Sequence, residues 1–481
     1  MLIPFGRWSP GLADTTPGGS RVIEGVIPLA DGAYGPMPQF STVAGAEALA
    51  EAPRGHISFP KADGTYVRYV ATSTDWYSFS ADGSFTSIVS GNSVPPGDRE
   101  SFLRFGDKLL GTNITDGFRA YDFETATADG TIAAAPAARF AFECGNVVIA
   151  LDCDGNNQLI QNSASNDHTD WTNGGADYQP LEGGGALVAG VAVSDGSAII
   201  FQREAIRFMQ FGGSGGGPLY SLYLMSDQAG AVNAGSVVGA AGGAFFIDTD
   251  GPKFVAPGAM PVSIGAKDGI SGWLDDNVAA GDLDTIEGAY DRFRRMVWWR
   301  VPVSGDSATV FSRMLGYHVD HDKWTRLTVT TSALFSTALP GFVWADLTDT
   351  WSTYNQFPWG DRYWQGGEPL FGGFDSDFKL ALFSGTPMAA TLESSLQQFP
   401  QSQYINSVTP ITDAASGTMQ IGVADRIGAP LTWTVEPSPI NDEGDCMFLE
   451  RGKAAKGRLN LAAGTVWTYA SGVDHPNTSG R

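Results

Sequence analysis

The feature that most constrains this fold is a strand–turn–strand unit that recurs from about residue 54 to residue 390. In each unit a short apolar run, alternating or continuous, stops at Gly, Asp or Pro and resumes a few residues later. Antiparallel strands joined by tight turns produce this pattern. The clearest turn is Asp250-Gly251, because glycine tolerates the positive φ that a two-residue hairpin demands. We expect one strand over 244–249 and the next from Pro252 to Ala256, since proline is tolerated at the first position of a strand.

Equivalent turns recur roughly every 35 to 50 residues, which is the period of units that each form one small sheet. The turns lie at Asp82-Gly83, Gly106-Asp107, Asp116-Gly117, Gly145-Asn146, Asp154-Gly155, Asp195-Gly196 and Asp250-Gly251. A sixth unit contains IEGAYDRFRRMVWWRVP and MLGYHVDHDKWTRL, and a weaker seventh runs through LFGGFDSDFKLALFSG. One such sheet cannot bury both faces alone, so several arranged radially are the stable solution. We therefore predict an all-β fold, a β-propeller of about six to eight blades over residues 46–390; a large multi-sheet β-sandwich is the alternative.

The two flanks of the repeats differ in composition. Residues 1–45 are rich in Pro, Gly and small residues, which predicts an extended N-terminal arm lying along a larger body. Residues 390–417 carry the Ser, Gln and Pro bias of a linker or loop. Four to five further strands are expected after it, so residues 391–481 are predicted to form a smaller C-terminal β domain that ends in a polar tail from Asp474.

Composition and charge exclude some classes of protein. Glycine numbers 61, proline 27, and only 17% of residues are charged, which is typical of a folded, turn-rich β protein and not of a disordered chain. The 52 acidic and 29 basic residues give a net charge of -23, which argues against tight binding to nucleic acid through its phosphates. Two interpretations of the acidity stay open. It can form a negative wall past which nucleic acid slides, or it can simply keep the protein in solution.

The number of cysteines and the N-terminal sequence indicate the cellular compartment in which the chain is made. With only Cys144, Cys153 and Cys446, no disulfide framework is expected. Cys144 and Cys153 could face each other across a hairpin, but we expect reduced thiols in the core. The start, MLIPFGRWSPGLADTTPGG, lacks the basic and apolar regions of a signal peptide, and no apolar run is long enough to cross a membrane. The sequence therefore predicts a chain made in the cytoplasm, with no membrane segment.

Three short motifs are candidates for sites of chemistry. Gly212 to Gly216 matches G-x-S-x-G around Ser214, but a nucleophile elbow needs a helix after it, and Pro218 and an apolar strand follow instead. Asp152, Asp154 and Asn156 resemble the start of a calcium loop, yet the glycine comes too early and Ser163 stands where a bidentate Glu is needed, so a hairpin turn is expected. His318 and His321 lack a third ligand nearby, so we expect surface turn residues, not zinc ligands.

Acidic and aromatic residues also gather late in the chain. Asp346, Asp349, Asp361 and Glu368 lie among Trp344, Trp351, Trp359, Tyr363 and Trp364, and Asp375 and Asp377 follow. Aromatic rings beside carboxylates suit stacking on sugars and equally suit a protein interface, and a carboxylate pair of a glycosidase could be among them. We favour an interface or loop tip here. The sequence thus predicts no catalytic residue, no metal ligand, no cofactor and no enzyme.

Several segments carry a resemblance to a known family. They are VIPLADGAYGPMPQFSTVAGA, REAIRFMQFGG, the SVV and FFIDTDGPKFV runs, Ser263-Ile264-Gly265 before Trp273, IEGAYDRFRRMVWWRVP and the closing Trp324. Together they resemble the structural proteins of tailed bacteriophages, and more narrowly the tail nozzle, or packaged-DNA stabilisation, proteins of short-tailed phages. The likeness covers roughly residues 20–330 and consists of short apolar and turn motifs.

The resemblance implies a virion tail protein whose subunits form a hexameric ring below the portal and its adaptor ring, with tail fibres as further partners. Such a ring closes the tail tube and lets DNA pass during ejection, in transient contact without tight binding. Two alternatives stay open: a receptor- or glycan-binding propeller of a phage tail, and a carboxylate-based glycoside hydrolase propeller.

Overall fold

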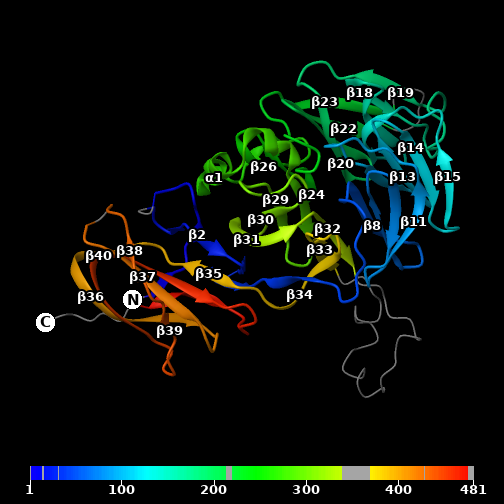
Figure 1. Ribbon diagram of the computed structural model, residues 1–481. Coiled ribbons are helices and arrows are strands. Elements are labelled where there is room, and N and C mark those ends of the chain that lie inside the picture. The colour runs from blue at the N-terminus through cyan, green and yellow to red at the C-terminus, as the bar shows by residue number, and fades with distance from the viewer. Residues whose placement is uncertain are drawn as a thin grey trace.

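The computed structural model describes residues 2–13, 16–30, 32–212, 219–338, 369–426 and 428–474. Almost all regular structure in them is β (Figure 1). The helices are the short α1 (Ile270–Asn277) and two short 3-10 helices, η1 (Ala266–Asp268) and η2 (Ala280–Thr285). The predicted all-β class is therefore confirmed within the described residues.

Six antiparallel four-stranded sheets stand as separate blades. Five of them follow one another along the chain: β8 (Gly55–Pro60), β9 (Tyr66–Ala71), β10 (Asp75–Phe79) and β11 (Phe85–Ser90); β12 (Ser101–Phe105), β13 (Lys108–Asn113), β14 (Gly117–Asp122) and β15 (Thr127–Thr131); β16 (Ala138–Glu143), β17 (Val148–Cys153), β18 (Asn156–Asn162) and β19 (Asp177–Pro180); β20 (Leu187–Ser194), β21 (Ser197–Gln202), β22 (Ile206–Phe211) and β23 (Tyr220–Ser226); β24 (Val238–Ala240), β25 (Gly243–Asp248), β26 (Gly251–Val255) and β27 (Val262–Ser263). The sixth contains β32 (Ala333–Ala338), β33 (Pro369–Phe374), β34 (Leu380–Pro387) and, from the other end of the chain, β7 (Pro38–Thr42).

One further antiparallel group of four strands completes the ring. It contains β28 (Glu287–Asp291), β29 (Met296–Val301), β30 (Phe311–His318) and β31 (Lys323–Thr331), and it belongs to a 15-stranded sheet. The first strands of successive blades contact one another in the order β8, β12, β16, β20, β24, β28, β32 and back to β8. These first strands therefore surround a common axis, which is the arrangement of a β-propeller. The predicted propeller is confirmed.

The predicted turns form where the chemistry of Gly, Asn and Asp favours them. The turn predicted at Asp250-Gly251 is displaced by one residue: Asp248 pairs with Gly251, so Thr249 and Asp250 are the two central residues and Gly251 begins β26. Asn146 and Asp154 adopt positive φ in their turns, a conformation that Asn and Asp tolerate better than other side chains. Asp195-Gly196 joins β20 to β21 through the Ser194–Ser197 pair. Local turn chemistry therefore sets the register of each blade.

The 15-stranded sheet continues from β31 into a second β region that contains both ends of the chain (Figure 1). Its further strands are β1 (Leu2–Pro4), β4 (Ile23–Glu24), β5 (Val26–Pro28), β6 (Tyr34–Pro36), β35 (Ala390–Glu393), β36 (Gln397–Thr412), β37 (Thr418–Ala424), β38 (Thr432–Trp433), β39 (Ser438–Pro439), β40 (Cys446–Leu461) and β41 (Ala470–Asp474). A small parallel pair, β2 (Arg7–Trp8) and β3 (Gly19–Ser20), lies beside it. The predicted domain boundaries at residues 45 and 390 stay a prediction.

The expectation of a linker over residues 390–417 is wrong. Residues 397–412 form β36, a strand of 16 residues that pairs with β40 and then with β41. Its Ser, Gln and Asn side chains are exposed or half-buried, whereas Ile405 and Val408 are buried. A strand with one solvent-facing side tolerates such polar composition, so the bias of this segment reflects exposure and not a lack of structure.

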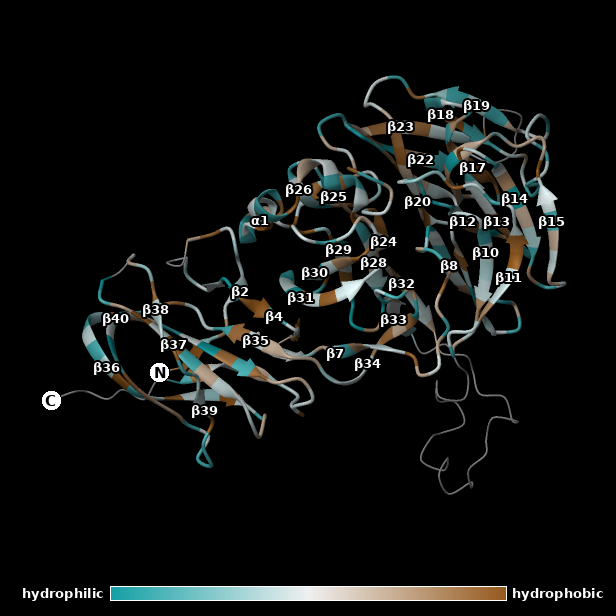
Figure 2. Ribbon diagram, in the orientation of Figure 1, coloured by the Kyte–Doolittle hydropathy of each residue, from teal (hydrophilic) through white to brown (hydrophobic). Residues whose placement is uncertain are grey.

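Apolar cores lie between neighbouring blades and inside the terminal β region. One cluster joins the second and third blades, another joins the third and fourth, and a large one links α1 and β28–β31 to the terminal strands. In Figure 2 the outermost strand β19 is hydrophilic, in agreement with the exposure of all four of its residues. Trp8 packs edge-on against Trp273 of α1 at 5.7 Å between ring centroids, which fixes the N-terminal residues to the helix.

Candidate functional site at the propeller axis

A cavity of about 640 Å³, here called the axial cavity, opens where five successive blades begin. Its walls come from the segments just before or at the first strands β12, β16, β20, β24 and β28, and from the turns after β13, β17 and β21. Because the first strands surround the axis, the cavity lies at one end of the axis. A site in this position receives side chains from several blades, each held by its own sheet.

Beside the axial cavity lies an ion cluster around the buried Glu287. Glu287, the first residue of β28, accepts a hydrogen bond from Arg99 Nη1 at 2.6 Å and another from Arg300 Nε at 2.6 Å. His56 of β8 places Nδ1 3.9 Å from the same carboxylate. Arg99 precedes β12, so the cluster joins three blades, and Gly235 leaves room for its guanidinium.

Burial and charge act in opposite directions on these groups. Burial alone would raise the pKa of the Glu287 carboxyl, but Arg99, Arg300 and His56 together hold that pKa well below its ordinary value. Burial lowers the pKa of His56, and the carboxylate of Glu287 only partly offsets it. Glu287 is therefore an anion held between two guanidinium groups, which is the condition under which a buried charge is tolerated.

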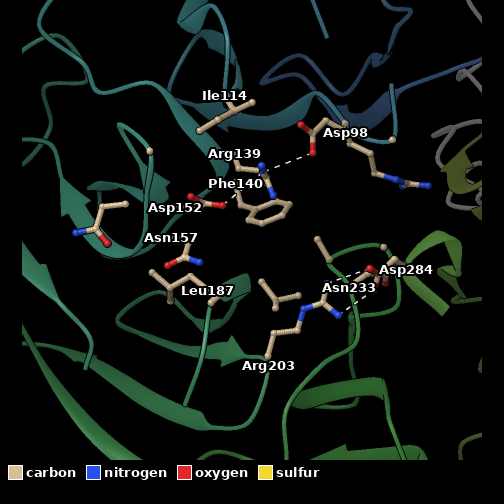
Figure 3. Close-up of a pocket in the computed structure, with 18 residues that line it drawn as sticks. Asp98, Ile114, Arg139, Phe140, Asp152, Asn157, Leu187, Arg203, Asn233 and Asp284 are labelled. Carbon is tan, nitrogen blue, oxygen red and sulfur yellow. Dashed lines mark hydrogen bonds and ion pairs between the residues drawn. The ribbon is translucent and has the colours of Figure 1, made fainter. Parts of the chain in front are cut away.

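The axial cavity itself carries a second set of charges (Figure 3). Arg139 Nε lies 3.5 Å from an oxygen of Asp98 and 3.4 Å from an oxygen of Asp152. On another side, Arg203 donates two hydrogen bonds to Asp284, at 2.8 and 3.1 Å. Phe140, Leu187 and Val188 add apolar surface between these polar groups. The cavity therefore combines paired charges with an apolar wall, as ligand sites generally do.

Asp152 has an unusual position for an aspartate. It lies at a β-bulge between Leu151 and Cys153 in β17, with φ +57. Its side chain is only 6% exposed. Burial raises its pKa, Asp98 adds to the rise, and Arg139 opposes both. Asp is one of the few non-glycine residues that tolerate this conformation, and a β-bulge redirects a side chain, often next to a site.

The sequence drew attention to Asp152 for a different reason. Asp154 accepts a hydrogen bond from the Ala137 backbone N–H, and Asn156 accepts one from the Gln158 N–H, as turn residues do. The expected hairpin turn is confirmed. The approach of Asp152 to Asp98 was missed, because the sequence gives no signal for a contact between separate blades.

His318 is not the surface turn residue that we expected, whereas His321 lies in the turn after β30 and is half-buried. His318 ends β30 and is buried, its ring stacks on His321 with centroids 4.0 Å apart, and its Nδ1 accepts a hydrogen bond from the His321 N–H at 3.3 Å. Burial, followed by His321, lowers the pKa of His318 to about 4. Among the described residues no three His, Cys, Asp or Glu side chains converge as a metal site requires.

The cysteines are free thiols in the core, as predicted. Cys144 and Cys153 do not face each other, because Cys144 lies at the turn before β17 and Cys153 pairs with Ala138 at the far end of that strand. Burial raises the pKa of Cys144 to about 11. Such thiols resist oxidation and act as packing residues.

Some of the other candidate residues lie within the described part of the chain and some lie outside it. Asp375 accepts hydrogen bonds from the backbone N–H groups of Asp377 and Lys379 and from the Thr42 hydroxyl, so it shapes a turn and ties β7 to its blade. Ser214 and the acidic and aromatic cluster from Trp344 to Glu368 lie outside the described residues. Within the described residues, no helix combines the length and the apolar character needed to cross a membrane.

Comparisons with known proteins identify no family for this chain. No protein-family model matches the chain, and no curated protein does. Among solved structures, it is similar to U3-55K at 8% identity and TM-score 0.41, over 73% of this chain and 100% of that one. It is also similar to a chain of the mitotic checkpoint complex, at 11% identity and TM-score 0.42, over 73% and 94%. A third is the Cps50 (Swd1) β-propeller domain of Myceliophteria thermophila, at 6% and 0.41, over 72% and 100%.

Proposed function

We propose that this chain is a structural subunit of the tail of a short-tailed bacteriophage. In this proposal its copies form a ring, the nozzle, that closes the tail tube, retains packaged DNA and lets the DNA pass during ejection. The resemblance over residues 20–330 supports the family, and the residue pattern supports a mechanical role over a catalytic one. The observation that carries the proposal is an exposed apolar strip on the terminal β region.

The apolar strip consists of Met447 and Leu449, whose side chains point outward from β40 and are 60% and 84% exposed. Side chains alternate along a strand, so Cys446, next to Met447, is buried in the core while Met447 and Leu449 face solvent. Tyr404 of β36 adds an exposed ring, and the Arg451 guanidinium lies 5.2 Å from its centroid. Large apolar side chains gathered on one face mark a surface that binds another protein.

The position of the apolar strip suits assembly. The β36–β40 ribbon is part of the sheet that runs into the propeller, and it lies at the opposite end of the molecule from the outer blades (Figure 1). A contact there would leave the propeller free for a second neighbour. Burying Leu449 or Met447 at an interface would stabilise the assembly by about 1.5–3 kcal/mol each. We propose neighbouring copies as the first occupant, and the adaptor ring and tail fibres as further partners.

The proposal places DNA in the lumen of the ring and not along the propeller axis, because Arg99 and Glu287, from blades that are not neighbours, are hydrogen-bonded to each other at the end of that axis. A net charge of -23 on each subunit would repel the phosphates of passing DNA. The acidic surface would then lower friction without holding the DNA.

Electron microscopy of the purified chain tests the proposal directly. We expect closed rings of identical subunits that bury on the order of 2,000 Å² at each contact. Particles that remain single subunits at high concentration would contradict the proposal. Once a ring identifies the lumen-facing carboxylates, changing several of them to Lys is expected to slow DNA release from assembled particles, and unchanged release would reject the sliding wall.

A further inference from the structure

Two carboxylates in the axial cavity share one arginine without forming a hydrogen bond to it. Arg139 Nε lies 3.5 Å from Asp98 and 3.4 Å from Asp152, and this buried nitrogen has no hydrogen-bond partner among the described residues. Figure 3 shows the two carboxylates on either side of the guanidinium. Hydrogen bonds between charged groups are normally shorter than about 3 Å, so this group of three is held by charge alone.

Asp152 is the less satisfied of the two acids. More than nine-tenths of its side chain is buried, it lines the axial cavity, and within the described part of the chain its carboxylate accepts no hydrogen bond. The Asp152 oxygens are not among the fully buried atoms that lack a partner, so they remain open to the axial cavity, where a donor can reach them. The bulge and the positive φ at Asp152 keep the side chain in this position.

The other arginines of the axial cavity are already engaged. Arg99 is bound to Glu287 at 2.6 Å, and Arg203 binds Asp284 through two hydrogen bonds. Asp98 and Asp152 therefore have only the single charge of Arg139 between them, which leaves this part of the cavity one negative charge in excess. The net charge of -23 attracts cations toward it from a distance.

We propose that the axial cavity binds a hydrogen-bond-donating cation, a guanidinium or primary ammonium group on a flexible stem, between Asp98 and Asp152. The head group supplies the donors that Asp152 lacks, and its charge balances the excess. Phe140, Leu187 and Val188 provide the apolar surface along which a methylene stem packs. A volume of about 640 Å³ accepts such a side chain together with part of the polypeptide that carries it. A free polyamine presents the same chemistry.

Calorimetric titration of the full chain at low salt tests this inference with defined probes. N-acetylarginine amide is the cationic probe, N-acetylcitrulline amide is its neutral counterpart of the same shape, and spermidine represents a free polyamine. We expect saturable binding of the arginine derivative and no measurable binding of the citrulline derivative. Tighter binding of spermidine than of the arginine derivative identifies a polyamine as the occupant, and the reverse order identifies a polypeptide side chain.

Two variants are expected to change the affinity for the arginine derivative in opposite directions. Asp152→Asn removes an acceptor and is expected to weaken binding of the arginine derivative roughly tenfold or more. Arg139→Gln removes the competing cation and is expected to tighten it. Asp377→Asn is the matched control, because Asp377 is exposed and far from the axial cavity in the fold. Thermal unfolding confirms that each variant is folded.

The opposite pattern overturns the proposal. If Arg139→Gln weakens binding of the arginine derivative while Asp152→Asn strengthens it, the axial cavity does not hold a cation between Asp98 and Asp152. If both variants bind the arginine derivative as Asp377→Asn does, the cavity is no site for a cation. The outcome is independent of the ring proposal, because the binding is measured on the isolated chain.

Discussion

Arg99 and Glu287 are 188 residues apart in the sequence, and their side chains meet at 2.6 Å at the end of the propeller axis. Arg99 precedes the first strand of one blade, whereas Glu287 begins the first strand of a blade that is not its neighbour in the ring. The pair therefore ties the ring together across its axis. Arg300 lies on the strand beside Glu287, and its Nε donates a hydrogen bond of 2.6 Å to the Glu287 carboxylate. This second guanidinium completes the neutralisation of the Glu287 charge.

The first prediction concerns the free energy of unfolding. Glu287→Gln leaves the Arg300 guanidinium, which is 6% exposed, without its counter-charge. Breaking a buried ion pair on one side costs about 3–5 kcal/mol, so urea denaturation is expected to show a loss of that order. The exposed pair Arg203–Asp284 is the control, and Arg203→Ala is expected to cost about 1 kcal/mol or less. Equal losses in the two variants would show that the axial cluster does not hold the ring together.

The second prediction concerns assembly. Replacing both Met447 and Leu449 by Glu puts two charges on the apolar strip and is expected to convert assembled rings to single subunits, because burying unpaired charges opposes association. Light scattering after gel filtration measures the mass. Val262→Glu is the control, since Val262 is 62% exposed on β27 of the propeller and outside the apolar strip. Rings that survive the double substitution would remove the strip from the interface.

The blades could be predicted from the sequence because their signals are local. Turns such as Gly106-Asp107 and Gly145-Asn146 form at the residues whose backbone preferences favour them. The origin of the closing strand could not be predicted in this way. β7 joins β34 although more than 300 residues separate them, as in the pair Phe383–Phe40, and no turn or periodicity encodes a partner so far away.

The contacts in the axial cavity could not be predicted from the sequence either. Asp152 stood out through its resemblance to a calcium loop, but its neighbours Asp98 and Arg139 come from other strands and loops. Likewise, Met447 and Leu449 form an ordinary apolar alternation in the sequence, and only the fold shows which side of β40 faces solvent. Contacts between blades arise from the closure of the ring and carry no sequence signal.

The third prediction uses two glycines. Gly316 faces Trp298 across β29 and β30, and a Cβ at Gly316 would lie 2.2 Å from the Trp298 ring. Gly316→Ala is expected to destabilise the protein by about 1–3 kcal/mol through overpacking. Gly272 lies on α1, and a Cβ there would meet no neighbouring atom within 4 Å, so Gly272→Ala is expected to stabilise by about 0.5–1 kcal/mol. Thermal denaturation of both variants checks the opposite signs, and two changes of the same sign would contradict the packing described.

The fourth prediction is a pH dependence of stability that originates at His318. Its pKa is lowered from 6.5 to about 4 by burial and by His321, with Arg295 and Lys323 acting in the same direction and Asp320 against them. Between these two values the unfolded chain binds more protons than the folded one, so stability falls as the pH is lowered through this range. His318→Gln keeps a hydrogen-bond acceptor but cannot titrate. Urea denaturation at about pH 8, 6.5, 5 and 3.5, a series with steps of roughly 1.5 units that spans both pKa values, is expected to show a shallower decline for His318→Gln than for the unmodified chain. Parallel declines in the two proteins would place the acid sensitivity at other groups.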